Sequence, residues 1–452
     1  MTRIILFSSL AMLQLAAMAQ ADTVFLKAFG GAFFEEASEV IQREGGGYTI
    51  VGTTGSNESG STDVFVASFD EELNCQWSRN YGNADADWGL SIVEDFSGNF
   101  LVTGYTLGDN TTSYDMMAMK LDAQGELMWR HTYGGSDWDF AHKIMAHPLG
   151  GFLICGRTYS NGNGDQDGTV LHIDGQGILL SQWFMGGTAK DAAADILRLD
   201  DGWAVGGYQT IDDKSVATIW KFDTMGNPQW ERMLNDTNGF NRELTALTSA
   251  NGYVYATGQV YSDAGTKSFE YRIPLDNSTE FEVVETQTFE FIYRDCVALN
   301  DKIVFVGSKI DNAIEVGRVV RKHSDLYFTG VFEFTGQYRA KFNSVIWNED
   351  ALVMCGSFQP TASGNPQAVL LKYTSSILNE VNSEPETAPC FSVGIDELTM
   401  PVAGDKGLLY SSTGQLVCDN YEWNTRSSDH PIASGIYFFV GKGRRAYAVY
   451  ID

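Results

Sequence analysis

A stretch of about fifty residues recurs along this 452-residue chain, and the repetition constrains the fold more than any other feature. The copy at residues 81–132 shows the pattern clearly, with four short runs rich in β-branched and aromatic residues between turns rich in Gly, Asn and Asp. Such runs predict a meander of four β-strands. One four-stranded sheet is too small to bury both faces, so neighbouring copies must pack against one another.

A glycine after the second run sets the register of the repeat, with successive spacings of 52, 52, 51, 51, 49 and 49 residues. Seven copies carry this glycine, at Gly52, Gly104, Gly156, Gly207, Gly258, Gly307 and Gly356. An aspartate ends the third run in five copies, at Asp70, Asp122, Asp174, Asp223 and Asp276. Four-stranded units at this period predict an all-β fold, a β-propeller, and seven copies predict seven blades.

The two ends of the repeat region complement each other. The seventh copy has three runs and lacks a fourth, whereas an isolated run stands at residues 23–29. We therefore expect this N-terminal strand to complete the last blade of a propeller that spans residues 22–377. Closing the ring would remove the open sheet edges that otherwise invite aggregation. An open array of sheets is the alternative.

Residues 1–21 predict a secretory signal peptide, because Arg3 precedes an apolar run that ends in small residues. No later run approaches the ~20 apolar residues that span a membrane, so we expect an exported chain without a membrane span. The formal charge of −28 argues against nucleic acid and anionic membranes as partners. Four of the six cysteines fit small core positions: Cys75, Cys155, Cys296 and Cys355.

The C-terminal part breaks the pattern. Residues 378–390 are polar, acidic and proline-bearing, and predict a linker. Residues 391–452 contain two hairpin patterns and predict a small β-sandwich. Cys390 and Cys418 make the one plausible disulfide.

Two resemblances accompany these patterns. The repeat D-W-x-x-S-I-V-x-D-x-S-G-N-F-L-V-T-G-Y-T resembles bacterial extracellular seven-bladed β-propeller (SBBP-type) repeats over residues 23–377, which implies a fold more than an activity. The tail, in segments 408–417, 432–440 and 442–452, resembles the C-terminal sorting domain of type IX secretion (the Por secretion system). That resemblance implies recognition by the outer-membrane translocon after periplasmic transit, and an extracellular or outer-membrane-surface location. A small domain packed on the propeller is the alternative.

We expect two sets of loops to share one face of the disc: those between blades, and those between second and third strands. Binding residues gather on loops that a rigid scaffold presents. Tryptophan beside aspartate can stack a sugar ring or a peptide side chain; alternatively, each tryptophan wedges between blades while Asp87 and Asp139 bond local backbone. The candidate ligand-binding residues are Asp87, Trp88, Asp137, Trp138, Asp139 and Arg157.

The loop at residues 161–168 is a candidate calcium site. Asn163, Asp165 and Asp167 alternate, and Asp174 follows eleven residues after Asn163, which partly matches a loop of hard oxygen ligands. Asp167 and Asp174 also stand in columns of the repeat, which favours a structural role for both. The sequence predicts no other cofactor.

No G-x-S-x-G motif, metal-spaced histidine pair or Cys–His pairing occurs, so the sequence favours a non-catalytic protein. We predict a secreted or cell-surface binding or scaffold protein that presents loops to a glycan, a peptide or an envelope partner. The alternative is an extracellular hydrolase that acts on polysaccharide through a carboxylate pair over the central channel. A purely structural envelope component is a third interpretation.

Overall fold

The computed structural model describes most of the repeat region and parts of the tail. The described residues are 23–29, 33–56, 61–107, 113–234, 241–262, 265–276, 282–285, 291–299, 301–311, 314–326, 328–334, 339–348, 351–359, 364–374, 391–393, 406–411, 416–422, 435–441 and 446–451. Every named element in these ranges is a β-strand. No helix in the described ranges has the length and apolarity needed to cross a membrane.

Five separate four-stranded antiparallel sheets follow one another along the chain. The first contains β2 (Glu35–Gln42), β3 (Tyr48–Thr54), β4 (Asp63–Phe69) and β5 (Cys75–Tyr81). The second contains β6 (Asp87–Glu94), β7 (Phe100–Leu107), β8 (Tyr114–Leu121) and β9 (Leu127–Tyr133). The third contains β10 (Asp139–Ala146), β11 (Phe152–Thr158), β12 (Asp167–Ile173) and β13 (Leu179–Met185).

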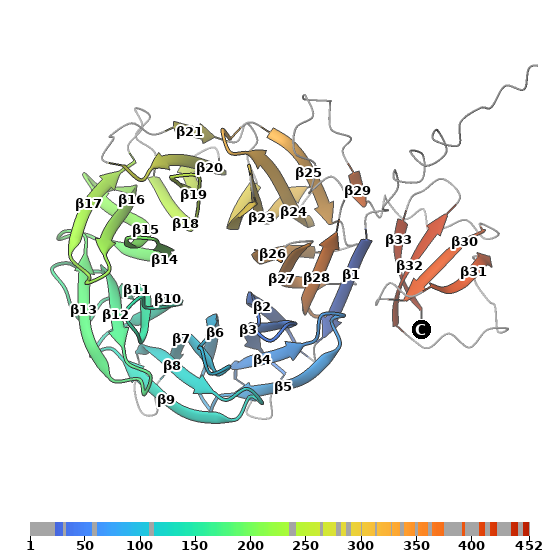
Figure 1. Cartoon of the computed structure of the whole chain (residues 1–452), viewed down its shortest axis with the longest axis horizontal. Helices are drawn as coiled ribbons and strands as arrows, with labels where there is room; N and C mark the ends of the chain where they lie inside the picture. The colour runs from blue at the N-terminus through green and yellow to red at the C-terminus, as the bar shows by residue number, and fades with distance from the viewer. Residues whose placement is uncertain are drawn as a thin grey trace, which may run out of the picture.

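The fourth sheet contains β14 (Ala192–Leu199), β15 (Gly202–Ile211), β16 (Lys214–Asp223) and β17 (Pro228–Met233). The fifth contains β18 (Asn241–Ala250), β19 (Tyr253–Ser262), β20 (Gly265–Pro274) and β21 (Glu282–Glu285). Figure 1 shows the sheets standing radially around one axis, with the first strand of each toward the middle and the last on the outside. This arrangement is a β-propeller.

The sixth sheet has nine strands and holds the last two copies of the repeat. It contains β22 (Phe291–Leu299), β23 (Lys302–Asp311), β24 (Ile314–His323), β25 (Phe328–Phe334), β26 (Arg339–Trp347), β27 (Leu352–Gln359), β28 (Gln367–Thr374), β1 (Thr23–Phe29) and β29 (Phe391–Val393). The sequence predicts seven blades, whereas the described residues form six sheets around the axis. The cause is local: β24 and β26 meet through one parallel pair, Glu315 with Arg339, which joins the two copies.

The N-terminal strand closes the ring. β1 pairs antiparallel with β28 along seven residues, from Thr23 opposite Thr374 to Phe29 opposite Ala368. One apolar core also spans this junction, because Val40 and Ile50 of the first sheet pack in the same buried cluster as Val353. Residues from the two ends of the repeat region thus share one sheet and one core, which is the arrangement expected of a closed ring.

In the C-terminal part, β30 (Lys406–Ser411), β31 (Leu416–Glu422), β32 (Gly435–Gly441) and β33 (Ala446–Ile451) form a four-stranded sheet of order β31-β30-β32-β33. The predicted signal peptide at residues 1–21 and linker at residues 378–390 lie outside the described residues. So do Cys390 and the side chain of Cys418. Of the four predicted core cysteines, Cys155, Cys296 and Cys355 are buried, but Cys75 is exposed on the outer strand β5.

A β-bulge interrupts the innermost strand of all seven copies and explains the glycine column. In β10 the bulge lies between Ala141 and Lys143 and turns the backbone toward the facing strand. A Cβ on Gly156 would lie 2.0 Å from the carbonyl oxygen of Phe140. A Cβ on any of the other six glycines would lie 1.8–2.1 Å from a backbone carbonyl oxygen. The sequence pattern predicts that the second strand ends at this glycine, and that prediction is wrong. In the second copy, for example, β7 continues past Gly104 to Leu107.

In five of the seven copies, the side chain after the bulge accepts a hydrogen bond from the backbone of the next copy; Lys143 and Ala246 are the exceptions. Asp195 Oδ2 accepts a hydrogen bond from the Leu247 amide at 2.7 Å, and Ser344 Oγ accepts one from Val40 at 3.5 Å across the closing junction. The residues that follow the bulges lie on successive innermost strands, and these strands form a ring around the axis of the disc (Figure 1). The ring residues are Glu39, Ser91, Lys143, Asp195, Ala246, Asp295 and Ser344.

Candidate functional site

Two of the predicted site residues, Asp87 and Asp139, begin the innermost strands β6 and β10 and are almost fully buried, with exposed fractions of 0% and 1%. Asp87 Oδ2 accepts a hydrogen bond from the Asn83 amide at 3.1 Å, and Asp139 Oδ2 accepts one from the Gly135 amide at 3.0 Å. Each carboxylate thus holds the loop that links its sheet to the preceding one. Neither presents its charge to solvent, so these residues organise the loop face.

The aromatic side chains of the same loop face form one continuous cluster. Trp88 stacks on Tyr105 with ring centroids 5.8 Å apart and an interplanar angle of 23°. Tyr105 meets Phe140 of the next sheet edge to face at 5.0 Å, and also meets Tyr114 at 5.5 Å. Trp138 lies 6.3 Å from Phe140, so the cluster crosses the interface between the second and third sheets.

Trp138 is the exposed end of this group of rings, and it also contacts Tyr159. Trp138 meets Tyr159 at 6.4 Å, and the Tyr159 amide donates a hydrogen bond to the Trp138 carbonyl at 2.9 Å. The Trp138 side chain is 53% exposed, whereas the other five rings are partly buried. We call these six rings the aromatic cluster: Trp88, Tyr105, Tyr114, Trp138, Phe140 and Tyr159. An indole held by its neighbours and open to solvent is suited to stack on a ligand.

Arg157 adds a positive charge to the aromatic cluster. Its guanidinium carbon lies 4.9 Å from the centroid of the Phe140 ring, a cation–π geometry. Its charge lowers the pKa of the buried His142, although burial is the larger cause; together they lower that pKa to about 4. Burial raises the pKa of Tyr105 to about 12, so its hydroxyl stays protonated at neutral pH.

The structure brings Trp88, Trp138 and Arg157 together, but through residues that sequence reasoning missed. Phe140 and Tyr105 connect the two tryptophans, and Tyr159 supports Trp138. The repeat period offered a signal, because Phe140 stands 52 residues after Trp88. Asp137 is exposed, and its amide donates to Ser160 Oγ at 3.0 Å. Asp137 therefore caps the loop beside the cluster.

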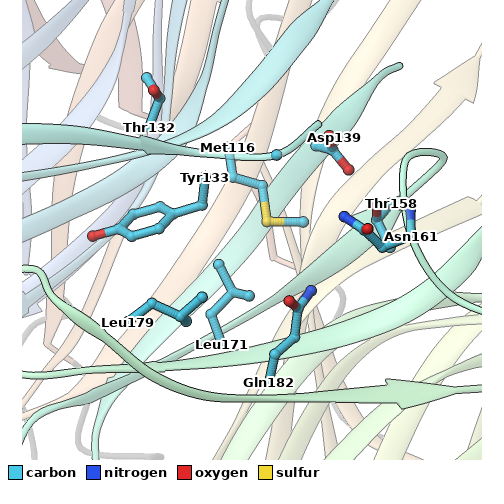
Figure 2. A pocket seen from close by; sticks show the side chains of 10 residues that line it. Met116, Thr132, Tyr133, Asp139, Thr158, Asn161, Leu171, Leu179 and Gln182 are labelled. Atoms are coloured by element: carbon cyan, nitrogen blue, oxygen red, sulfur yellow. Dashed lines mark hydrogen bonds between the residues drawn. The ribbon is translucent and has the colours of Figure 1, made fainter. Parts of the chain in front are cut away.

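A pocket of about 250 Å³ opens beside Asp139, between the second and third sheets (Figure 2). Met116, Leu171 and Leu179 form its apolar part, and Tyr133 stands along one side. Its polar lining consists of Thr132, Asp139, Thr158, Asn161 and Gln182, with Gly134 completing it. The pocket thus combines an apolar floor with one buried carboxylate.

The four calcium candidates do not converge. Asp167 and Asp174 stand at opposite ends of β12, about 23 Å apart at the usual rise per residue. Asp167 Oδ2 accepts hydrogen bonds from the amides of Asn163 and Gly164, both at 3.0 Å, while Asp165 is exposed. Asp174 Oδ1 instead accepts from the turn amides of Gln176 and Ile178. Within the described ranges, no group of three or more His, Cys, Asp or Glu residues is arranged to hold a metal ion.

The axis of the disc holds a buried charge cluster rather than an open carboxylate pair. Lys143 forms an ion pair with Glu39, and the charges of Asp195 and Asp295 raise its pKa further. Burial raises the pKa of Asp195 to about 6, with Lys143 opposing the shift. Asp195 and Asp295 each accept hydrogen bonds from two backbone amides. Their oxygens are therefore engaged in holding the innermost strands.

No protein-family model matches the chain, and no curated protein matches its sequence. Among solved structures, the chain is similar to the WD40 β-propeller domain of Doa1, with 12% identity, 79% of this chain and 99% of that one covered, and a TM-score of 0.48. It is also similar to the phage phi92 endosialidase, with 8% identity, coverage of 94% and 87%, and a TM-score of 0.47. A third similar structure is the β-propeller domain of the Trilobed protease from Pyrococcus furiosus, with 9% identity and a TM-score of 0.45. The match covers 80% of this chain and 99% of that one.

The geometry of the loop face suits recognition better than bond breaking. The aromatic cluster offers flat apolar surface, Arg157 offers a charge and hydrogen-bond donors, and the pocket offers a buried carboxylate. On this face the Ser160 hydroxyl donates to Asp139 Oδ2 at 2.7 Å, and the same oxygen accepts from the Gly135 amide at 3.0 Å, so this contact holds the loop. Rigid aromatic side chains with a neighbouring arginine are the composition typical of binding hot spots.

Proposed function

We propose that the protein is a secreted or cell-surface scaffold whose aromatic cluster and Arg157 bind a glycan, a peptide or another envelope component. The observation that carries this proposal is the continuous contact from Trp88 through Tyr105 and Phe140 to the exposed Trp138. Each ring is held by a neighbour, so little side-chain entropy is lost when a ligand stacks on it. The rigid disc beneath the cluster supports the same role.

A panel of immobilised glycans and peptides tests the proposal. The wild-type chain is expected to bind a subset of one class, and Arg157→Ala is expected to weaken that binding at least tenfold. Phe96→Ala is a matched control, because Phe96 is 93% exposed at the opposite end of the β6–β7 hairpin. The proposal would be contradicted if the wild-type chain bound none of the glycans or peptides. It would also be contradicted if Arg157→Ala bound the ligand as tightly as wild type.

The proposed route to the cell surface is type IX secretion, with residues 391–452 acting as the sorting domain for the translocon. The supporting observations are the tail segments 408–417, 432–440 and 442–452, and the four-stranded sheet formed by β30 to β33. Intact mass of the protein from culture medium and cell surface is the test. A species that starts near Asp22 and ends before about residue 390 is expected; a full-length chain retained in the periplasm would contradict sorting.

We also propose that the two halves of the nine-stranded sheet work as separate blades, which would make the propeller seven-bladed in the SBBP manner. Each half has its own bulge, between Tyr293 and Asp295 and between Phe342 and Ser344, and its own facing glycine. One residue pair joins the halves. Amide hydrogen exchange tests this: the two halves should exchange as independent units, and one shared exchange behaviour would contradict it.

The alternative function, an extracellular hydrolase that acts on polysaccharide, has one observation in its favour. Asp115 and Asp139 approach each other near Gly134, and burial together with the Asp139 charge raises the pKa of Asp115. A pair of carboxyl groups that includes one with a raised pKa is typical of glycosidases. The same pair recurs at Asp63 and Asp87, next to the Arg130 ion pair, which favours a structural and binding role. Turnover of a glycan panel that is lost in Asp115→Asn would reverse this preference.

A further inference from the structure

The residues that line the pocket beside Asp139 have counterparts one repeat earlier, and one of the side-chain differences between the two sets changes the charge. Every described counterpart of a lining residue stands 52 positions before it: Val64 for Met116, Asn80 for Thr132, Tyr81 for Tyr133, Gly82 for Gly134, Asp87 for Asp139, Thr106 for Thr158, Met119 for Leu171, Leu127 for Leu179 and Arg130 for Gln182. The two interfaces are thus built to one plan. An arginine occupies the position where the pocket has a glutamine.

Arg130 shows what the shared plan accommodates. Its Nη2 atom donates a hydrogen bond to Oδ1 of the buried Asp87 and another to Thr106 Oγ1 at 3.0 Å. The guanidinium thereby neutralises the carboxylate at the first interface. Gln182 is shorter and uncharged, and its amide donates instead to Thr169 Oγ1 at 3.0 Å. The space that one arginine side chain occupies at the first interface remains open at the second.

Among the described residues, no cationic side chain forms an ion pair with Asp139 or Asp115 beside the open pocket. Asp139 is 1% exposed, and its Oδ2 accepts hydrogen bonds from Gly135 and Ser160, but its Oδ1, the counterpart of the atom that Arg130 contacts, accepts none from the described residues. Asp115 Oδ1 is also buried and without a hydrogen bond from them. A Cβ on Gly134 would lie 2.5 Å from Asp115 Oδ1 and from Asp139 Oδ2, so both carboxylates converge beside the pocket.

We infer that this pocket binds an arginine side chain presented by a peptide or protein partner. The planar guanidinium matches a carboxylate through parallel N–H donors, and it is less strongly hydrated than an ammonium group. Met116, Leu171 and Leu179 would contact the methylene stem, as long basic side chains require. The inference rests on the proposed binding function and narrows the ligand to a partner that carries arginine.

The pocket and the aromatic cluster share a loop, which explains how one partner would contact both. Trp138 directly precedes Asp139, and Tyr159 directly follows Thr158 of the pocket lining. Adjacent residues of a strand point to opposite faces, so within β10 the Asp139 carboxylate of the pocket and the Phe140 ring of the cluster lie on opposite sides of the same backbone. A peptide stacked on Trp138 would need to reach only across this loop edge to place an arginine in the pocket.

Titration with a small probe tests the pocket separately from the aromatic cluster. The probe is Nα-acetyl-L-arginine N-methylamide, and the matched uncharged probe is its citrulline analogue, which keeps the shape of the side chain. Ligand-observed NMR or calorimetry is expected to show saturable one-to-one binding of the arginine probe and at least tenfold weaker binding of the citrulline probe. Absence of saturable arginine binding, or equal binding of both probes, would overturn the inference.

Four substitutions complete the test. Gln182→Arg supplies the guanidinium from the chain itself, as Arg130 does, and is expected to abolish probe binding while the protein stays folded by thermal unfolding. Asp139→Asn is expected to weaken probe binding at least tenfold, and Phe96→Ala to leave it unchanged. Undiminished binding in a folded Gln182→Arg variant would overturn the inference. Trp138→Ala should leave binding of the arginine probe unchanged. A result that contradicts ligand binding by the aromatic cluster can therefore be told apart from one that contradicts arginine binding by the pocket.

Discussion

Arg130 forms an ion pair with the buried Asp87, whereas at the equivalent positions 52 residues later Gln182 is uncharged and Asp139 forms no ion pair with a described residue. Removing one partner of a buried pair leaves an uncompensated charge. Arg130→Gln should therefore lower the free energy of unfolding by about 3 kcal/mol. Gln182→Arg should raise it, because Asp139 gains a partner. Urea unfolding of both variants measures the two changes, and destabilisation by both substitutions would contradict the proposed equivalence of the interfaces.

The bulge and the glycine column make a second prediction. Gly156→Ala would place a Cβ 2.0 Å from the Phe140 carbonyl oxygen, so one of the paired strands must shift. We expect a loss of at least about 3 kcal/mol in the free energy of unfolding, the range of severe backbone and packing clashes.

Gly175→Ala in the same sheet is the matched control, since a Cβ there would meet nothing within 4 Å. Its effect should stay within about 1 kcal/mol. Equal effects of the two substitutions in thermal or denaturant unfolding would show that the bulge does not require the glycine.

The third prediction concerns the closing strand. A chain that starts at Asp22 retains β1, whereas one that starts at Gly30 loses its seven-residue ladder with β28. The shorter chain should be destabilised by several kcal/mol, because β28 gains an open edge and the last sheet loses its outer strand. Calorimetric melting of the two truncations decides the matter. Equal melting temperatures would mean that β1 does not hold the ring closed.

The charge cluster on the axis predicts a specific pH dependence. Lys143→Met removes the cation that opposes the raised pKa of Asp195 and of Asp295, so both carboxyl pKa values should rise further. An acid whose pKa is raised in the folded state contributes stability below its unfolded pKa and loses it as the pH rises through the folded pKa.

The variant should therefore be less stable than wild type by about 3 kcal/mol at pH 7, and this deficit should shrink as the pH falls toward 5. The wild-type carboxyl resonance of Asp195 should titrate with a midpoint near its pKa of about 6. A stability deficit that does not change between pH 7 and pH 5 would count against the buried cluster.

Periodicity predicted the fold because the repeat obeys local rules. Alternating runs, turn glycines and the seven copies determine strands, sheets and a ring, and each copy is consistent with the others. The period could not predict the fusion of the last two copies, which depends on one contact between Glu315 and Arg339. Nor could it show why Gly156 is a glycine, because the carbonyl that excludes a side chain comes from a bulge in another strand.

The site was only partly visible in the sequence. Trp88, Trp138 and Arg157 are conspicuous by residue type, but their contacts run through Tyr105 and Phe140, and proximity across an interface has no signature in linear spacing. The calcium candidates show a related limit of linear spacing: Asp174 has the expected spacing from Asn163, and the whole of β12 lies between the two.

Ligand binding by the aromatic cluster is tested most directly by comparing the affinities of the Trp138→Ala and Phe96→Ala variants. Trp138 is exposed at 53% and anchored by Phe140 and Tyr159, so its removal deletes stacking surface without opening the core. For a ligand from the glycan or peptide panel, the account predicts that Trp138→Ala raises the dissociation constant at least tenfold, while Phe96→Ala leaves it unchanged. Equal dissociation constants for the two variants would contradict the account.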